Sequence, residues 1–167
     1  MKKRSVTVKE LDHAEFGRYG AFANLINPDA PHLGEEPIEF YRDMALLDLG
    51  GKPAALSTCR VCRRPLVVDV SEYHNGCGEA LVPLDGDVLI HVAPASGGDA
   101  VPTDEMEVYR VPKGTAVVLR PGVWHHAPFA LEQECVNVLI ILPERTYAVD
   151  CHVERLSKKE RVRIAGA

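Results

Sequence analysis

The sequence lacks any long apolar run. The longest, at residues 138–142, is far too short to span a bilayer, and the N-terminal Lys and Arg residues are followed by no apolar stretch. No signal peptide is therefore predicted. These absences lead us to expect a cytoplasmic protein that does not contact a membrane.

Basic charge is also scarce. Nineteen Lys and Arg residues face 24 Asp and Glu residues, giving a net charge of −5. Phosphate backbones are bound by a basic field, so a nucleic-acid partner is not expected. Short basic runs at residues 2–4 and 158–161 are expected to be solvated. With 167 residues, 46% of them hydrophobic, residues 1–167 are expected to form one domain with a sizeable core.

Cysteines are few and odd in number. Five cysteines suit reduced thiols better than a disulfide framework. Cys59 and Cys62 have the spacing of a zinc or redox half-motif, but no second pair completes a zinc site. They also lie in a strand-like run, where residues three apart face opposite sides. We expect no functional pair there.

Helical periodicity is limited to short segments. Asp12, with Glu15 three residues later, predicts a capped helix over residues 12–18, and a terminal helix could follow Ser157. Residues 24–37 carry three prolines and are predicted to form a loop.

Most of the remaining chain consists of short strand-like runs separated by Gly, Pro, Asp and Asn. The expected strands are residues 6–8, 45–49, 54–60, 66–72, 80–83, 88–93, 106–111, 116–119, 125–130 and 135–142. This spacing predicts an all-β sandwich or barrel, and the lack of intervening helices disfavours a parallel sheet.

The segment around residue 75 groups side chains that bind metals. Glu72 and His74 are two residues apart, so on a strand they share one face. A turn at residues 75–76 reverses the chain, and Glu79 can return to the same face. Two carboxylates and an imidazole suit a divalent ion such as Mn, Fe, Ni or Zn.

Two hairpins of the sequence resemble the paired motifs of cupins, H-x-H-x3,4-E-x6-G and G-x5-P-x-G-x2-H-x3-N. In the first motif His74, Glu79 and Gly86 match, while Glu72 replaces the leading histidine. In the second motif the matching residues are Gly114, Gly122 and His125, while Arg120 and Phe129 depart from it. The spacing from Gly122 selects His125 as the ligand. His126, adjacent on a strand, then faces the other way unless a bulge turns it inward.

A closer resemblance covers nearly the whole chain. Residues 16–20, 41–46, 72–74, 80–83 and 123–126 resemble the ureidoglycolate lyase family, which also has Glu at the start of the first motif. The resemblance implies an all-β cupin (double-stranded β-helix or jelly-roll barrel) with short peripheral helices. It further implies a homodimer that uses a divalent metal to split ureidoglycolate into glyoxylate and urea during allantoin and purine breakdown. The chain departs from the family at Glu79, where Gln is frequent, at Asp85 and at residues 142–145.

The roles that follow are these. Metal ligands are expected at Glu72, His74, Glu79 and His125, and catalytic roles at Glu72, His74 and His125. Either Glu72 or Glu79 could act as the base. Arg60 and His126 are predicted to contact the substrate, with Arg42 and Arg110 as other candidates, because a guanidinium suits a carboxylate. Two alternatives stay open: a cupin isomerase or dioxygenase acting on another small acid, and a non-enzymatic cupin that binds a small molecule.

Overall fold

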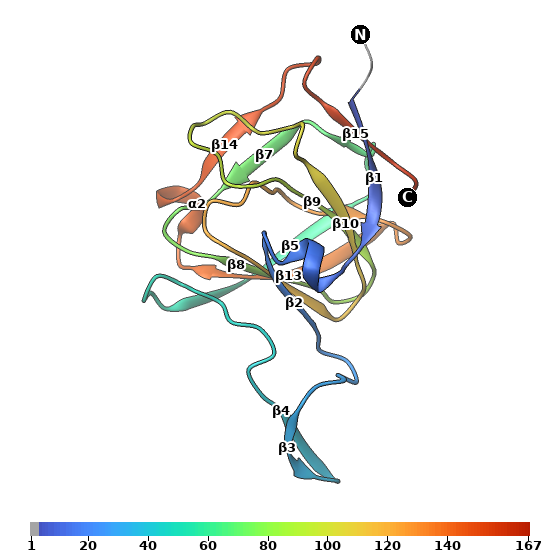
Figure 1. Cartoon of the computed structure of the whole chain (residues 1–167), viewed down its shortest axis with the longest axis vertical. Coiled ribbons are helices and arrows are strands. Elements are labelled where there is room, and N and C mark those ends of the chain that lie inside the picture. Colours follow the sequence, from blue (N-terminus) through green and yellow to red (C-terminus); the bar gives the residue numbers. More distant parts are fainter. Residues whose placement is uncertain (1–3) are drawn as a thin grey trace.

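The computed structural model describes residues 4–167, and strands dominate it (Figure 1). The first strands are β1 (Arg4–Glu10), β2 (Gly20–Asn24), β3 (His32–Glu35), β4 (Ile38–Tyr41), β5 (Ala54–Cys62), β6 (Val67–Val68), β7 (Val70–Tyr73) and β8 (Glu79–Pro83). The others are β9 (Val88–Val92), β10 (Glu107–Val111), β11 (Thr115–Leu119), β12 (Phe129–Ala130), β13 (Cys135–Pro143), β14 (His152–Arg155) and β15 (Val162–Ala165). The two helices, α1 (His13–Phe16) and α2 (Thr146–Val149), are single turns at the periphery.

Two curved sheets form the barrel. One has the order β2-β11-β8-β13-β5, with antiparallel neighbours throughout. The other has the order β12-β9-β10-β1-β15-β6, in which β1 runs parallel to both β10 and β15. Strand β7 pairs with β14. An antiparallel bridge between Glu72 and His125 joins β7 to the segment that carries His125. This architecture confirms the predicted fold class, an all-β barrel with short peripheral helices.

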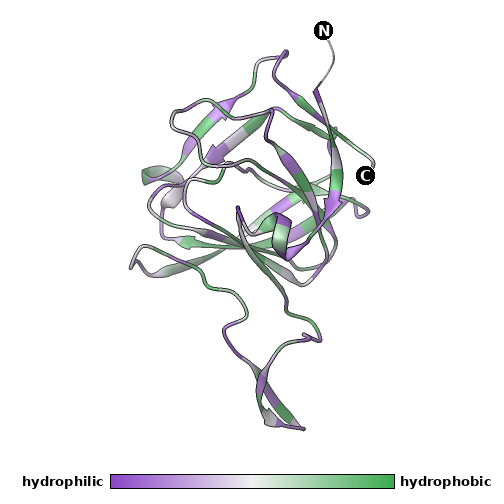
Figure 2. Cartoon of the chain, viewed as in Figure 1, coloured by the Kyte–Doolittle hydropathy of each residue, from purple (hydrophilic) through white to green (hydrophobic). Residues whose placement is uncertain are grey.

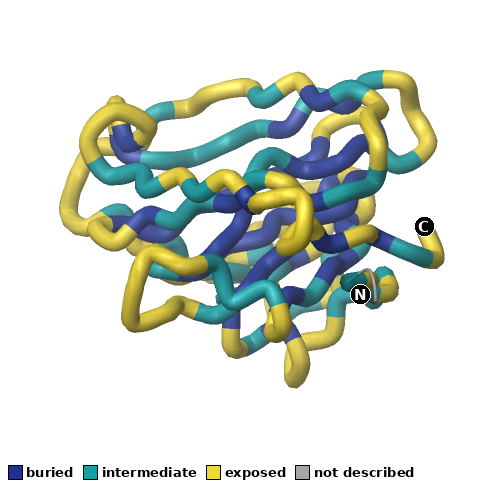
Figure 3. The backbone as a smooth tube through the Cα atoms, turned by 90° about the horizontal axis from the view of Figure 1, so that it is seen from above, coloured by how far each residue is buried: buried dark blue, intermediate teal, exposed yellow. Residues whose placement is uncertain are grey.

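The core consists of two clusters of buried residues. One lies between the two sheets, and the other lies on the opposite face of β9. Val88, Ile90 and Val92 pack into the cluster between the sheets, while Leu89 and Ala93 pack into a second cluster on the opposite face. Every residue of β8, β9 and β11 is buried. Figure 3 shows the buried stretches of the chain, in dark blue, gathered in the interior of the molecule. Strands covered on both faces form a rigid frame for the side chains at their ends.

Several sequence predictions are wrong in detail. Residues 24–37, predicted as a loop, contain β3, which forms a hairpin with β4, and residues 45–49 form no strand. The tail forms β15 instead of a helix, because it pairs with both β1 and β6. Only Phe129–Ala130 of the expected strand 125–130 is a regular strand.

Other predictions are confirmed. Asp12 caps α1 by accepting hydrogen bonds from Ala14 N and Glu15 N. The basic run 158–161 is exposed. Residues 2 and 3 of the other basic run lie outside the described residues, and Arg4 pairs with Asp104. No helix among residues 4–167 is long and apolar enough to cross a membrane.

The cysteines contradict the expectation of reduced thiols. Cys62 and Cys135 stand opposite each other on β5 and β13 and form a disulfide, while Cys59, Cys77 and Cys151 are free. The prediction is therefore wrong for two of the five, because strand pairing brings distant cysteines face to face. Cys62 is bonded to Cys135 and not to Cys59.

Candidate metal centre

Main-chain hydrogen bonds between the two motif segments position the site. Glu72 N donates to His125 O at 2.6 Å, and His125 N donates to Glu72 O at 2.8 Å. Gly122 N donates to His74 O at 2.6 Å. The two segments predicted to carry ligands are therefore held side by side, although about 50 residues separate them in the sequence.

Three predicted ligands meet inside the barrel. His74 Nε2 lies 3.2 Å from Glu79 Oε2, and His125 Nε2 lies 3.1 Å from the same oxygen. The three residues are buried, with exposed fractions of 4%, 8% and 4% for His74, Glu79 and His125. The structure thus brings both imidazoles to one carboxylate, as the motif spacing predicted.

The far side of each ring is fixed by a main-chain carbonyl. His74 Nδ1 lies 2.6 Å from Asp150 O, and His125 Nδ1 lies 2.8 Å from Val123 O. A carbonyl oxygen can only accept, so each Nδ1 carries the proton. In the neutral rings, each Nε2 therefore presents its lone pair to the centre of the site.

The close contact between Glu79 and the two imidazoles shifts their pKa values in opposite directions. Burial alone would raise the pKa of Glu79, but the two imidazoles lower it below its usual value. Burial alone would lower the pKa of His125, but the Glu79 carboxylate raises it above its usual value. Without a cation between them, Glu79 and protonated His125 form a buried ion pair.

Glu72 completes the group from β7. Ligand atoms of Glu72, His74 and His125 lie within 4.8 Å of one another. Glu72 is only half-buried, and its Oε2 accepts a hydrogen bond from Cys151 Sγ at 3.4 Å. Burial, together with Glu72, raises the pKa of Cys151 to about 12, so this thiol remains a protonated donor.

These residues fit a divalent metal. When both rings are neutral, two Nε2 lone pairs face one carboxylate oxygen and no hydrogen lies between them. A cation at this point would supply the positive charge that all three ligand atoms require. Ligand atoms in neighbouring positions around an ion with bonds of about 2.1 Å lie roughly 3 Å apart, close to the spacing found here. The mixed imidazole and carboxylate set suits Mn, Fe, Ni or Zn.

The predicted arginines do not join the cluster. Arg60 is exposed on β5, whereas its neighbours Cys59 and Val61 pack toward the core, so its side chain lies on the outer face. Arg42 pairs with Asp43 beyond β4. Arg110 binds Asp87 at the far end of β10.

His126 does lie beside the site. It is half-buried, and burial lowers its pKa, as do His125 and Arg64 nearby. The guanidinium of Arg64 lies over the ring of Phe129 at 3.9 Å and donates to the carbonyls of residues 127 and 128. Arg64 is thus the arginine that holds the segment after His126, and no motif pointed to it.

Sequence reasoning also missed the groups behind the ligands. The Asp150 carboxylate accepts from Asn75 N at 3.1 Å and Gly76 N at 2.8 Å, holding the loop after His74. Ser71 Oγ donates to His125 O at 3.1 Å and lies 3.2 Å from Nε2 of buried His91. Asp150 lies outside both motif segments, so the spacing of the motifs did not indicate its role.

A sequence model of the ureidoglycolate lyase family matches residues 3–164. The chain belongs to the ureidoglycolate lyase family. The family is thus shown over almost the whole length, as the residues around the two motifs predicted. No protein with a curated description matches the chain significantly.

Solved structures with a similar fold are distant. They include an oxalate decarboxylase from Bacillus subtilis, with 16% identity and a TM-score of 0.44 over 63% of this chain and 24% of the other. A dTDP sugar isomerase from Desulfovibrio desulfuricans G20 has 13% identity and a TM-score of 0.47 over 83% of this chain and 84% of the other. This chain therefore matches only about a quarter of the length of the decarboxylase. Likenesses this weak say nothing about substrate or metal.

Proposed function

We propose that this member of the ureidoglycolate lyase family cleaves ureidoglycolate into glyoxylate and urea with the help of a divalent metal held by His74, Glu79 and His125. The observation that carries the proposal is the convergence of two imidazole Nε2 atoms, each fixed through Nδ1, on one buried carboxylate. Glu72, which is half-buried, lies next to this group. Family membership selects the reaction, and the donor set supports the metal.

The chemistry requires two proton movements. Ureidoglycolate is a hemiaminal, so loss of its hydroxyl proton lets the oxygen form the aldehyde bond of glyoxylate while the carbon–nitrogen bond breaks. The departing nitrogen then takes up one proton and leaves as urea, which balances the reaction. A bound divalent ion would lower the pKa of the substrate hydroxyl and hold its oxygens.

Glu72 is the residue best placed to accept the hydroxyl proton. Glu79 is buried, and its Oε2 contacts both imidazoles. Glu72 is only half-buried, so a substrate can reach it. The Cys151 thiol donates to Glu72 Oε2, which leaves the other carboxylate oxygen for a substrate. A carboxylate base within hydrogen-bond reach contributes about 10²–10⁴-fold to such a step.

His126 is proposed to contact the substrate, as the sequence predicted. It lies next to His125, with the charges of Glu72 and Arg64 nearby. Arg60 is not part of this proposal, because its side chain lies on the outer face of β5.

The reaction can be tested directly. The chain is stripped of metal, reloaded with Mn, Ni, Zn or Fe(II), and incubated with ureidoglycolate while glyoxylate is measured against the spontaneous decay of the substrate. We expect excess glyoxylate only with metal present. Glu72→Gln should lower kcat by about 10²–10⁴-fold while metal binding persists. The exposed variant Glu144→Gln serves as the matched control and should keep full activity.

Absence of excess glyoxylate with every metal would reject the reaction. If metal still bound tightly, the isomerase and dioxygenase alternatives on another small acid would remain. If neither metal binding nor turnover were found, the non-enzymatic alternative would be favoured. The single-domain organisation, the cytoplasmic location and the homodimer remain predictions from the sequence.

A further inference from the structure

His91 is a polar residue in an apolar part of the core. It is 1% exposed on β9 and shares its face of the strand with Leu89 and Ala93 of the second core cluster. Its ring lies 6.5 Å from the ring of Phe129 in the same cluster. Most barrel strands carry both hydrophilic and hydrophobic residues in Figure 2, whereas His91 is the one polar residue of β9.

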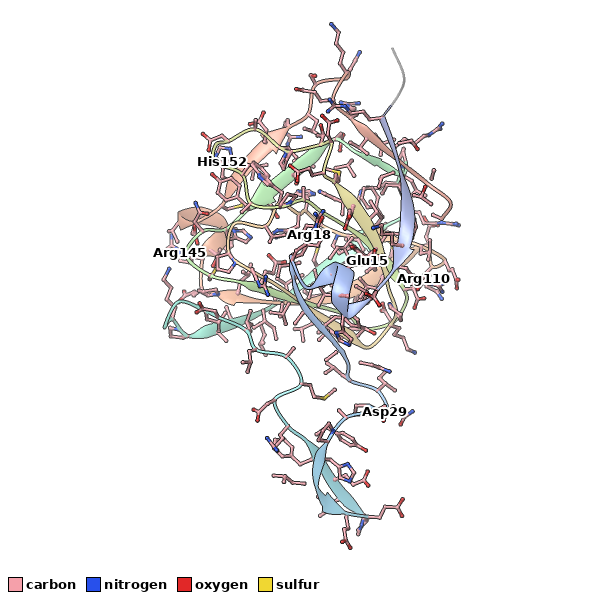
Figure 4. All side chains as sticks on the ribbon, viewed as in Figure 1. Glu15, Arg18, Asp29, Arg110, Arg145 and His152 are labelled. Carbon is pink, nitrogen blue, oxygen red and sulfur yellow. A yellow bond between two sulfur atoms is a disulfide. The ribbon has the colours of Figure 1, made fainter. Side chains whose placement is uncertain are left out.

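One nitrogen of His91 is enclosed without a hydrogen bond. Within residues 4–167, its Nδ1 meets neither a donor nor an acceptor. The other buried atom of this kind is Nε2 of His152, a residue that is 36% exposed and lies near the rim of the molecule in Figure 4. A bare ring nitrogen in an apolar cluster costs stability, and a leucine would avoid that cost. Packing therefore does not explain a histidine at this position.

The opposite nitrogen of His91 is engaged. Its Nε2 lies 3.2 Å from Ser71 Oγ, and the Ser71 hydroxyl donates to the main-chain oxygen of His125 across 3.1 Å. Because that carbonyl can only accept, the hydroxyl hydrogen points to it, and the Ser71 oxygen must accept from His91. The His91 proton is therefore on Nε2. Burial holds the pKa of His91 well below its usual value, so the ring is neutral and Nδ1 stays bare.

The hydrogen bonds of the His91–Ser71 pair end on the peptide bond between His125 and His126. The same carbonyl accepts from Glu72 N at 2.6 Å, so two adjacent residues of β7 hold one planar peptide group. Residues 126–128 belong to no strand, and strand pairing therefore does not fix this plane on its far side. A rotation of the plane would move the side chains on both sides of it.

We propose that His91 is a positioning residue that acts through Ser71. It fixes the plane of the peptide bond after His125, and so aims this metal ligand and the next residue, the substrate contact His126, together. The His125 ring is held by Val123 O, so fixing its main chain also places its Nε2. Strand β9 is buried along its whole length, so His91 ties the ligand segment to the rigid frame of the barrel. This role rests on the proposed metal site and adds what holds it in place.

The test separates positioning from packing. His91→Leu keeps an apolar side chain in the cluster but donates nothing to Ser71, whereas His91→Gln retains an N–H that can donate. Val108→Ala is the matched control, because Val108 on β10 is paired with His91 and is buried in the same cluster. The affinity for Mn or Ni is measured by competition with an indicator dye, and stability by the urea midpoint.

We expect His91→Leu to bind metal about 10–100-fold more weakly with a urea midpoint no lower than that of the wild type. His91→Gln should recover most of the affinity. Val108→Ala should show the reverse pattern, a lower midpoint with unchanged affinity. At saturating metal, His91→Leu should also raise the KM for ureidoglycolate, because the same peptide plane carries His126.

A second variant covers the case in which His91→Leu does not fold. Ser71→Ala breaks the hydrogen-bond pair at its middle and should lose at least as much metal affinity. If the two residues act as one unit, the double variant should lose no more than Ser71→Ala alone. Losses that simply add would overturn the action of His91 through Ser71.

Amide exchange in the metal-free chain gives a readout that does not need the metal. The Glu72 amide, which donates to the His125 carbonyl, should exchange faster in His91→Leu than in the wild type or in Val108→Ala. Wild-type metal affinity and wild-type Glu72 exchange in His91→Leu would overturn the positioning role and leave the proposed function standing. A lower urea midpoint with unchanged affinity would show that His91 only packs. A wild-type chain that binds no metal would instead reject the proposed metal site, and the aiming of a ligand with it.

Discussion

His74 donates its Nδ1–H to the main-chain oxygen of Asp150 across 2.6 Å, which ties a ligand in the first motif to a residue near the end of the chain. The carboxylate of the same Asp150 accepts hydrogen bonds from Asn75 N and Gly76 N. One residue therefore fixes both the ring of His74 and the loop that follows it. Such partners behind a ligand set ring orientation and basicity.

Replacing Asp150 should weaken metal binding. Asp150→Ala retains the main-chain carbonyl that holds His74 but removes the carboxylate that accepts from Asn75 N and Gly76 N, so the loop that follows His74 is no longer held in place. We expect an affinity about 10–100-fold lower, measured by competition with a metal indicator dye. Asp150→Asn should recover part of the loss, because one amide oxygen can still accept. The surface variant Asp104→Ala should bind metal like the wild type, and equal binding by Asp150→Ala would refute this positioning role.

The ligand set predicts a graded response to substitution. His74→Ala and His125→Ala each remove an Nε2 from the cluster and should reduce metal affinity by more than the roughly 10–100-fold expected for an outer partner. Glu79→Gln keeps a carbonyl oxygen and should lose less. The control His32→Ala changes a histidine on β3, which lies outside the cluster. Calorimetric titration with Mn or Ni would measure all four, and unchanged affinity in both histidine variants would rule out the site.

The sequence anticipated those features that rest on local pattern. The short apolar runs of β8 and β9 between turn residues, and the fixed spacing of His74, Glu79 and His125, could be read from the sequence. Pairing between distant segments could not be anticipated in this way. The tail after Ser157 is predicted to be helical from its own sequence. It forms β15 instead because β1 lies beside it and pairs with it.

The same limit applies to the site. The roles of Asp150 and Arg64 depend on main-chain atoms of other segments, which leave no mark in the spacing of side chains. The chemistry of its guanidinium makes Arg60 a predicted substrate contact, but strand alternation turns its side chain outward. The β3–β4 hairpin was missed because its prolines and glycine indicate a loop, and the strands between them are short.

An ion pair far from the site predicts a pH-dependent stability. Burial alone would raise the pKa of Asp87, but Lys113 N–H and the Arg110 guanidinium lower it below its usual value. A carboxylate with a depressed pKa stabilises the fold above its unfolded pKa, and this stability is lost as the pH falls through the folded value. Asp87→Asn should therefore cost about 1–2 kcal/mol at pH 7 in urea unfolding.

The cost of Asp87→Asn should shrink as the pH falls below about 4, because the carboxyl of the unfolded chain takes up its proton there, and it should vanish once the pH is below the lowered pKa of the folded carboxyl. Asp104→Asn, whose side chain is 82% exposed, is the control and should change stability little at either pH. A cost for Asp87→Asn that stays constant down to pH 2.5 would show that the charge of Asp87 is not what stabilises the fold.

The disulfide between Cys62 and Cys135 should stabilise the chain mainly through its unfolded state. Nine residue pairs already hold β5 against β13 in the folded protein, so the bond adds little order there. Unfolded, it closes a loop across 73 positions and restricts the chain. Replacing both cysteines by Ala should therefore lower the free energy of unfolding by about 2–4 kcal/mol and raise the denaturant m-value, because the free chain exposes more surface. Reductant should shift the unfolding midpoint of the wild type toward that of the double variant and leave the variant unchanged, whereas a wild-type midpoint insensitive to reduction would disprove the stabilisation.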